Sequence, residues 1–191
     1  MQTTLDRNQE NITQWVCEMA LADSQQALKA LYLTYFERLM RFVATYVSPQ
    51  ESVEEVVSDT FLVIWENRKK LLEVGRFDAY LYAVARNKAV SYLRTQQQEM
   101  CSLDEIPVDL YDATCTSPEE DLISQEEIRL LNEAIQSLPP KCRMAFKLVR
   151  EDHFKYKEAA SILQISVKTL EAHVATAVRK LYRSEEHTSE L

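Results

Sequence analysis

Glycine occurs only once in this 191-residue chain, at Gly75, and proline occurs five times. A fold built from β-strands needs many tight turns, and tight turns depend heavily on these two residues. The chain instead carries long segments in which apolar residues recur every three or four positions, which is typical of amphipathic helices. We therefore predict an all-α protein of two small helical domains joined by a flexible acidic linker, with a helix-turn-helix in the C-terminal domain.

The first domain is predicted over residues 20–98, after an N-terminal extension over residues 1–19. Its first helix covers residues 24–47. A second helix begins at the stretch SPQE, with Ser48 as a cap candidate, Pro49 in the first helical position and Glu51 completing a capping box, and it runs to about Lys70. The third helix follows a break at Gly75. Each helix has an apolar stripe that is expected to face the core. In the first helix the stripe is Leu28, Leu31, Tyr35, Leu39, Phe42 and Tyr46, and in the second it is Val53, Val56, Val57, Phe61, Ile64 and Trp65. In the third helix it is Tyr80, Leu81, Val84, Ala85, Val90 and Leu93.

Residues 99–123 contain Pro107 and Pro118, many acids and no sustained period, so we expect an extended linker there. The second domain is predicted over residues 124–182. Its first helix, residues 124–137, turns Ile128, Leu131 and Ile135 inward, and LPP ends it. PKCRMAFKLVRE then begins a helix with proline in its first turn. YKEAASIL, a turn at Gln164 and ISVKTLEAH complete a helix-turn-helix candidate.

Charge is distributed unevenly along the chain, although the net charge is −8. Between Glu66 and Arg94 seven basic residues stand against three acids, and between Ile128 and Arg183 eleven stand against five. Between Thr95 and Glu127 there are ten acids and no base. Two basic blocks that flank an acidic segment are compatible with nucleic-acid binding, because the local charge matters more than the sum.

The last predicted helix has a buried stripe and a polar outer face. Ser166 is the expected N-cap. The inward residues are Ile165, Val167, Leu170, Val174 and Val178. Small and polar outward side chains would let such a helix lie deep in a major groove, with Arg179 and Lys180 suited to phosphates. Spacing alone leaves DNA contact and a solvated face equally open.

The stretch RFDAYLYAVARNKAVSYLR, residues 76–94, interleaves aromatic and basic residues. Aromatic rings beside basic side chains suit unstacked bases. From the residues alone, plain core packing of Tyr80 and Tyr82 is the better interpretation.

Four stretches, VSDTFLVIWENRKKL, FDAYLYAVARNKAVSYLR, SLPPKCRMAFKLV and YKEAASILQISVKTLEAHVATAVRKL, resemble in this order the regions of bacterial sigma factors of the sigma-70 family. The compact two-domain form is similar to the extracytoplasmic-function (ECF) group. The resemblance covers residues 20–182. It implies a promoter-specificity subunit of RNA polymerase, not an enzyme, with a region 2 over residues 20–98 and a region 4 over residues 124–182. It also implies that the acidic linker threads the channel of the polymerase that RNA later uses.

The resemblance assigns roles to three sets of residues. Region 2 would bind the core polymerase and would melt the minus-ten promoter element, trapping a flipped base in a pocket that includes the loop of residues 71–77. Region 4 would read the minus-thirty-five element. The residues implied for core polymerase are Asp59, Leu62, Trp65 and Arg68; for the minus-ten element Arg76, Phe77, Arg86, Asn87, Lys88, Ser91 and Arg94; and for the minus-thirty-five element Lys168, Thr169, Glu171, Ala172, His173, Ala175, Thr176 and Arg179.

The chain departs from the family pattern around the helix-turn-helix. Many members have glycine where this chain has His153 and Gln164, which implies left-handed backbone at two non-glycine residues, at a cost of roughly 1 kcal/mol each. Lys155 replaces a common serine cap. Glu171 places a carboxylate near phosphates, unless it accepts a hydrogen bond from a cytosine amino group.

The implied partners are core RNA polymerase, promoter DNA and an anti-sigma factor, which in this group is often membrane-bound. A stand-alone helix-turn-helix regulator of the response-regulator output type is the alternative, since its recognition helix has a very similar pattern. An enzyme is disfavoured because the chain has no G-x-x-x-x-G-K-[ST], H-E-x-x-H or G-x-S-x-G motif. We expect no metal and no cofactor, because Cys17, Cys101, Cys115 and Cys142 lack the close spacing of a zinc or redox site and are expected to be reduced thiols.

No apolar run approaches the roughly 20 residues that span a bilayer, and the first residues lack a signal-peptide core, so we expect a cytoplasmic protein without membrane insertion. The tail RSEEHTSEL, residues 183–191, resembles the translation of a common sequencing-adapter oligonucleotide. We therefore expect this tail to be non-native and leave it out of the reasoning on the fold.

Overall fold

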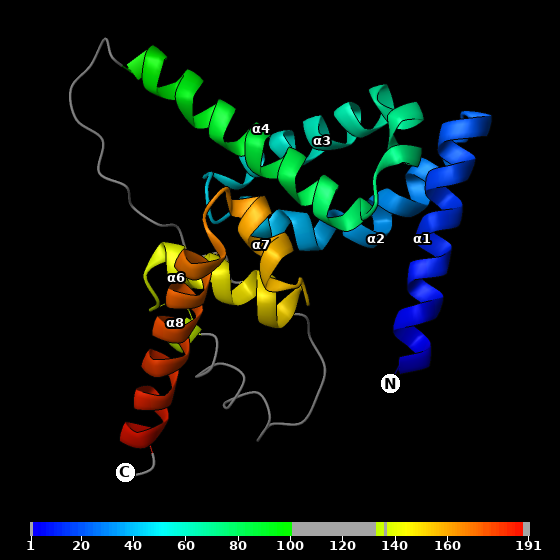
Figure 1. Ribbon diagram of the computed structural model, residues 1–191. Coiled ribbons are helices and arrows are strands. Elements are labelled where there is room, and N and C mark those ends of the chain that lie inside the picture. The colour runs from blue at the N-terminus through cyan, green and yellow to red at the C-terminus, as the bar shows by residue number, and fades with distance from the viewer. Residues whose placement is uncertain (1, 101–132, 136, 189–191) are drawn as a thin grey trace. The chain divides into compact units, whose positions relative to one another are not determined.

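The computed structural model describes residues 2–100, 133–135 and 137–188, and the described residues are helical with no strand (Figure 1). The chain forms two compact units, Met1–Tyr111 and Asp112–Leu191. The division between them falls within the predicted linker, of which residues 101–123 lie outside the described residues. The all-α prediction is confirmed.

Four helices and one 3-10 helix build the first unit (Figure 1). They are α1 (Gln2–Ala22), α2 (Gln25–Val43), α3 (Gln50–Glu66), the 3-10 helix η1 (Arg68–Glu73) and α4 (Phe77–Met100). α1 packs against α2 and η1, and α4 packs against both α2 and α3. Their shared core includes Met19, Leu31, Leu39, Ile64, Leu81 and Tyr82, all fully buried.

α1 was not predicted as part of the first domain, which we expected to begin at residue 20. Its apolar residues Ile12, Val16 and Met19 follow one another at steps of four and three, and all three are buried. This spacing places them on one face of the helix. The helix is therefore an integral part of the first unit, and burying each of these side chains contributes roughly 1.5–3 kcal/mol.

Local chemistry explains where α2 and α3 begin. The hydroxyl of Ser24 accepts a hydrogen bond from the backbone N–H of Ala27 at 3.2 Å and so caps α2. The predicted cap at Ser48 is wrong, because Pro49 occupies the N-cap position of α3 and no side chain caps this helix. α3 also ends earlier than predicted, at Glu66, and the chain tightens into η1 before Gly75.

The buried stripe of α4 is displaced from the predicted one. Tyr80, Val84, Val90 and Leu93 are only half-buried. The fully inward positions are Phe77, Leu81, Tyr82, Ala85 and Ala89. The rings of Phe42 and Tyr82 lie 5.0 Å apart, which shows that Tyr82 is a core residue between α2 and α4. Two alanines on this face let the neighbouring helices approach closely.

The second unit contains α6 (Pro140–Phe146), the π-helix η2 (Lys147–Glu151), α7 (Tyr156–Leu163) and α8 (Val167–Thr188). Pro139 caps α6 and Pro140 is its first residue, as predicted. Of the helix predicted over residues 124–137, only 133–135 and 137 are described; residues 133–135 are helical, with Ile135 buried, and Ile128 and Leu131 lie outside the described residues. α8 packs on both α6 and α7, and Leu138, Cys142 and Ala177 form a buried cluster with Phe146 and Leu181 against it.

Candidate nucleic-acid interface

α7, the turn at Gln164 and α8 form the predicted helix-turn-helix. Gln164 has φ 55° and ψ 44°, the left-handed conformation, and its N–H closes α7 on the carbonyls of Ala160 and Ser161. Ser166 then begins α8, since its hydroxyl accepts a hydrogen bond from the N–H of Thr169 at 3.0 Å. The cap at Ser166 and the left-handed backbone at Gln164 are both as predicted.

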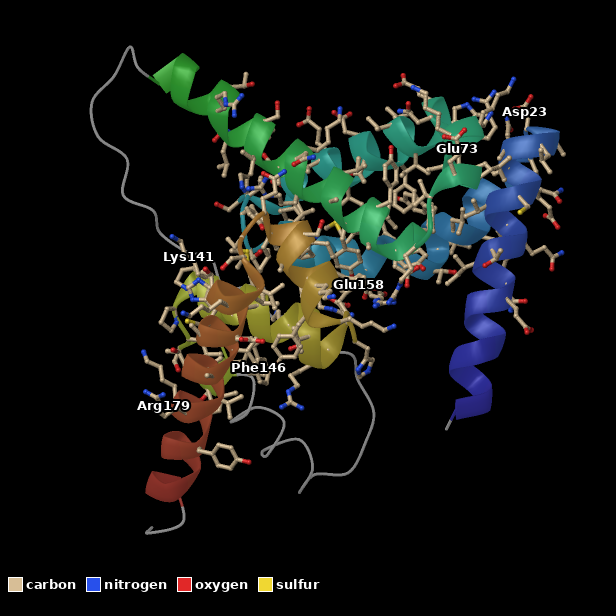
Figure 2. The ribbon with its side chains drawn as sticks, in the orientation of Figure 1. Asp23, Glu73, Lys141, Phe146, Glu158 and Arg179 are labelled. Carbon is tan, nitrogen blue, oxygen red and sulfur yellow. The ribbon has the colours of Figure 1, made fainter. Side chains whose placement is uncertain are left out.

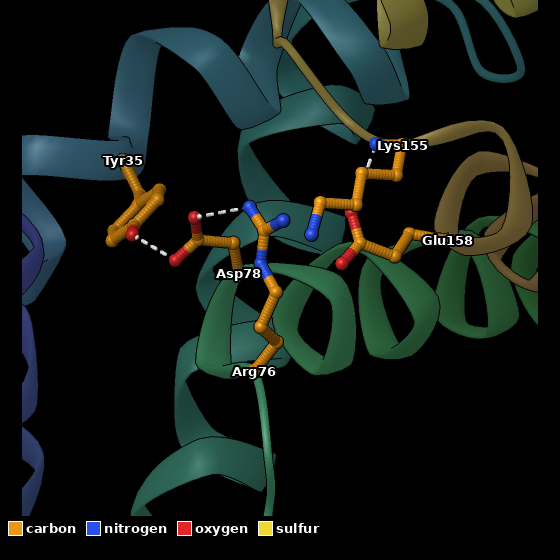
Figure 3. A network of polar contacts seen from close by, with 5 residues as sticks. All are labelled: Tyr35, Arg76, Asp78, Lys155 and Glu158. Carbon is orange, nitrogen blue, oxygen red and sulfur yellow. Dashed lines mark hydrogen bonds and ion pairs between the residues drawn. The ribbon is translucent and has the colours of Figure 1, made fainter. Parts of the chain in front are cut away.

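The start of α7 is capped in an unexpected way. His153 has φ 57°, so the second predicted left-handed residue is also confirmed. Lys155 offers no side-chain cap, but its own backbone N–H donates a hydrogen bond to the carboxylate of Glu158 at 2.9 Å (Figure 3). Half of a capping box is therefore present although the serine is missing.

The N-terminal half of α8 carries an exposed polar face. The side chains of Lys168, Thr169, Glu171, Ala172, Ala175 and Arg179 are exposed. Thr176 is half-buried, and its hydroxyl donates to the carbonyl of Ala172 at 2.8 Å, one turn earlier. Leu170, Val174 and Ala177 anchor the opposite face in the core. The exposed face therefore combines small side chains at its middle with longer charged ones, and the opposite face packs in the core. Figure 2 shows Arg179 on this helix.

His173 does not lie fully on the exposed face, contrary to the prediction. Its side chain is half-buried, and its Nδ1 lies 3.8 Å from Sγ of Cys142 on α6. The sequence spacing gave no sign of this contact, because Cys142 and His173 belong to different helices. His173 thus helps to join α8 to α6 as well as bordering the polar face.

On α4 the predicted residues divide into an exposed and an internally bonded set. Asn87, Ser91 and Arg94 are exposed and follow one another at steps of four and three, so they share one face of the helix. Arg86 is half-buried, and its Nη1 donates to Oδ1 of Asn87 at 3.2 Å. Burial raises the pKa of the Tyr46 hydroxyl, and the Arg86 guanidinium beside it partly opposes this rise.

Phe77 and Lys88 are both held within the first unit. The Phe77 side chain is only 8% exposed, and its ring packs edge-on against Tyr35 with centroids 5.8 Å apart. It is a core residue of the first unit. Lys88 is half-buried, and its Nζ forms an ion pair with Oδ2 of Asp59 on α3 at 3.2 Å.

Arg76, just before α4, belongs to a polar network that reaches into the core (Figure 3). Its Nη2 lies 3.4 Å from Oδ2 of Asp78, and Oδ1 of Asp78 accepts a hydrogen bond from the hydroxyl of Tyr35 at 2.6 Å. Tyr35 is fully buried. Burial and the nearby Asp78 carboxylate raise the pKa of the Tyr35 hydroxyl well above its ordinary value. The network fixes the start of α4 relative to α2.

The residues predicted to bind a protein partner gather at the end of α3 and the start of η1. Leu62 is 60% exposed, as large apolar side chains elsewhere in this unit also are, for example Leu33 on α2 at 67%. Trp65 is half-buried beneath the guanidinium of Arg68, whose Cζ lies 4.4 Å from the ring centroid. Arg68 also pairs with Asp23, a residue that the sequence did not point to.

The described residues thus define a helical protein with a helix-turn-helix in one unit and a separate polar helix face in the other. Residues 31–99 match the family model described as Sigma-70 region 2, and residues 128–181 match the model described as Sigma-70, region 4. The two matches together span more than half of the chain, in the expected order. The chain therefore belongs to the sigma-70 family, in its ECF group.

Individual relatives agree with this assignment. The chain is 27% identical over 171 residues to the ECF RNA polymerase sigma-E factor of Escherichia coli (strain K12), covering 86% of this chain and 89% of that protein. It is 23% identical over 171 residues to the sigma-E factor of Haemophilus influenzae (strain ATCC 51907 / DSM 11121 / KW20 / Rd), covering 86% of this chain and 90% of that protein.

Solved structures show the same fold. The sigma factor RpoE from Bartonella quintana, in complex with the anti-sigma factor NepR, gives a TM-score of 0.59 at 22% identity, over 83% of this chain and 96% of that one. CnrH, in complex with the cytosolic domain of CnrY, gives a TM-score of 0.57 at 19% identity, over 90% of this chain and 96% of that one.

The protein is thus a sigma factor that directs promoter-specific transcription, and the stand-alone regulator considered from the sequence is not favoured, because a region 2 accompanies the helix-turn-helix. Among the residues that the structure describes, no helix is long and apolar enough to cross a membrane. The same residues contain no cluster of histidine, cysteine or acidic side chains suited to a metal ion.

Proposed function

We propose that α8 enters the major groove of the minus-thirty-five promoter element. The exposed face of its N-terminal half, with small side chains at its middle, carries this proposal. Ala172 and Ala175 would allow close approach, Lys168 and Thr169 lie at the helix N-terminus where phosphates are favoured, and Arg179 suits a phosphate further along. Glu171 would accept a hydrogen bond from a cytosine amino group. Thr176 and His173 would border the contact, Thr176 with its hydroxyl bonded within the helix.

In region 2, the exposed face of Asn87, Ser91 and Arg94 would contact the minus-ten element. Its polar side chains can hydrogen-bond an unstacked base, and flipping a base costs a few kcal/mol that such bonds and stacking must offset. Arg76 and Arg86 would act from the edges of this face, because both are held by bonds within the unit. Phe77 and Lys88 would support the surface by packing and by the ion pair with Asp59.

The surface formed by Leu62, Trp65 and Arg68 would bind core RNA polymerase, with Asp59 at its edge. Tryptophan and arginine are enriched at interface centres, where they carry much of the binding energy, and the exposed Leu62 beside them adds apolar area. In this function the protein is a specificity subunit of the polymerase in the cytoplasm and not itself an enzyme. An anti-sigma factor is a further proposed partner, since the similar sigma factor of Bartonella quintana was solved in complex with one.

The test separates polymerase binding from DNA recognition. Purified protein is mixed with core RNA polymerase, and co-elution on a sizing column and promoter opening are both measured. We expect a stable complex for the unchanged chain. Alanine at both Asn87 and Ser91 should abolish opening, detected by permanganate reactivity, and should leave co-elution intact. Alanine at both Lys168 and Arg179 should remove protection of the minus-thirty-five element.

The matched control is alanine at Glu37, an exposed residue on α2 outside all three surfaces. This variant should behave like the unchanged chain in every assay. If the Asn87 and Ser91 variant fails to co-elute, these residues are structural. If the unchanged chain forms no complex with core polymerase, the proposed polymerase surface is wrong.

A further inference from the structure

Three interactions fix the guanidinium group of Arg68. Its Nε donates to the carboxylate of Asp23, its Nη1 donates to the backbone carbonyl of Trp65 at 2.9 Å, and its Cζ lies 4.4 Å from the centroid of the Trp65 ring. Two of these contacts join Arg68 to Trp65, three residues earlier in the chain. The bond to Asp23 is the only one of the three that ties the group to a distant part of the unit.

Asp23 lies at the junction of α1 and α2, at the end of α1 where Figure 2 labels it. Its φ is 51°, so its backbone has a left-handed conformation that fixes the direction of its side chain. The Asp23 side chain is 58% exposed, whereas that of Arg68 is 21% exposed. The hydrogen bond from Arg68 lowers the pKa of the Asp23 carboxyl and so favours its ionised form.

We propose that Asp23 is a positioning residue for the polymerase-binding surface, through its hold on Arg68 over the ring of Trp65. The proposal rests on the proposed polymerase-binding role of Leu62, Trp65 and Arg68. A free arginine side chain loses rotamer freedom when it is fixed in an interface, which weakens binding. Asp23 fixes the guanidinium before the partner arrives, and it also keeps the exposed edge of Trp65 in one arrangement.

The exposure of Asp23 makes a clean test possible. Asp23→Gly removes the carboxylate, and glycine accepts a φ of 51° more readily than aspartate does. Asp23→Asn keeps the shape and the backbone preference but removes the charge. We expect both variants to bind core polymerase about three- to fivefold more weakly, the upper range for an exposed ion pair. Glu10→Gln, which removes one exposed acid from α1, should leave the affinity unchanged.

Two further measurements separate positioning from a general structural role. In an Arg68→Ala background, Asp23→Gly should have no further effect on the affinity, because the two residues act through one contact. In a Trp15→Phe background Trp65 is the only tryptophan. Asp23→Gly should then change the fluorescence emission of Trp65 in the free protein, since the guanidinium would no longer be held over the ring.

The outcomes distinguish this inference from the proposal on which it rests. If Leu62→Ala and Arg68→Ala weaken polymerase binding but Asp23→Gly does not, the positioning role is wrong and the surface stands. An equal effect of Asp23→Gly with and without Arg68 would also overturn the positioning role. If Leu62→Ala and Arg68→Ala leave binding unchanged, both the surface and the inference fail.

Discussion

Replacing Tyr35 with phenylalanine would remove one hydroxyl group from the core of the first unit and leave the ring in place. This hydroxyl is fully buried and donates to Oδ1 of Asp78 at 2.6 Å. Without it the Asp78 carboxylate keeps only the longer contact to Nη2 of Arg76, at 3.4 Å. The Asp78 carboxylate, whose side chain is 13% exposed, would thus lose its best donor, and no cavity would form to complicate the comparison.

A hydrogen bond to a charged group contributes about 1.5–3 kcal/mol, so we expect Tyr35→Phe to lower the free energy of unfolding by about 2 kcal/mol. With a urea dependence of about 2 kcal/mol per molar for a small domain, the midpoint should fall by about 1 M. Both tryptophans, Trp15 and Trp65, belong to the first unit. Tryptophan fluorescence therefore follows the unfolding of this unit in the intact chain.

The matched control is Tyr92→Phe, which removes a hydroxyl that donates to Oγ of Ser52 at 2.7 Å and accepts from Nε2 of Gln96 at 2.9 Å. Both bonds join neutral groups on half-buried residues, and such bonds contribute less than a bond to a charged group, so the loss should be smaller than in Tyr35→Phe. An unchanged midpoint for Tyr35→Phe, or a loss no larger than in the control, would refute the reasoning that the Asp78 carboxylate depends on this donor. A changed slope of the free energy of unfolding against urea concentration would instead indicate that the substitution alters the unfolded state.

Two further predictions concern backbone strain and pH. His153→Gly should stabilise the second unit by up to about 1 kcal/mol, because His153 has φ 57°, and should slow amide hydrogen exchange in α7, whereas His153→Val should speed it. Faster exchange in the glycine variant would show that the left-handed backbone at His153 does not lower the stability of the second unit. The raised pKa of Tyr35 means that the folded state keeps a proton that the unfolded state releases, so stability should fall as the pH rises above about 10, the ordinary pKa of tyrosine. Urea midpoints of the unchanged chain and Tyr35→Phe should converge over this range, and a constant difference between them would contradict the assigned shift.

Much of the fold was predictable because its information is local. The 3.6-residue period located α2, α3 and α4, and Ser24 and Ser166 are caps whose side chains act within three residues of themselves. α1 was missed as part of the first unit, although the spacing of Ile12, Val16 and Met19 carried the signal. The residues around them are polar, which makes this apolar stripe harder to recognise than those of α2 and α3.

The errors within helices have a common physical cause. The predicted inward stripes included Ala85 but missed Ala89 in α4 and Ala177 in α8, which are fully buried as well. Alanine is buried where helices approach one another closely, and this depends on the neighbouring helix and not on the local sequence. α4 packs on both α2 and α3, so its buried face is also broader than one stripe.

For the candidate site residues, the sequence predicted which of them share a helix face but not which contacts they make. The exposed faces of Asn87, Ser91 and Arg94 and of the first turns of α8 follow from helical spacing. Long-range partners do not: Asp59 with Lys88, Asp23 with Arg68 and Cys142 with His173 join residues at least 29 positions apart. Each of these contacts moves a predicted binding residue from a freely exposed position to a held one.

Whether a residue is freely exposed or held by a long-range contact decides how variants of region 2 are to be interpreted. The Asp59–Lys88 ion pair joins α3, which carries the proposed polymerase surface, to α4, which carries the proposed minus-ten face. Loss of promoter opening in Lys88→Ala would thus report on the placement of α4 as well as on any contact with DNA. Ser91 and Arg94 are exposed on the same helix, so their truncation leaves this packing intact. Substitutions at these two residues therefore measure recognition of the minus-ten element directly, and Lys88 measures how firmly that face is held.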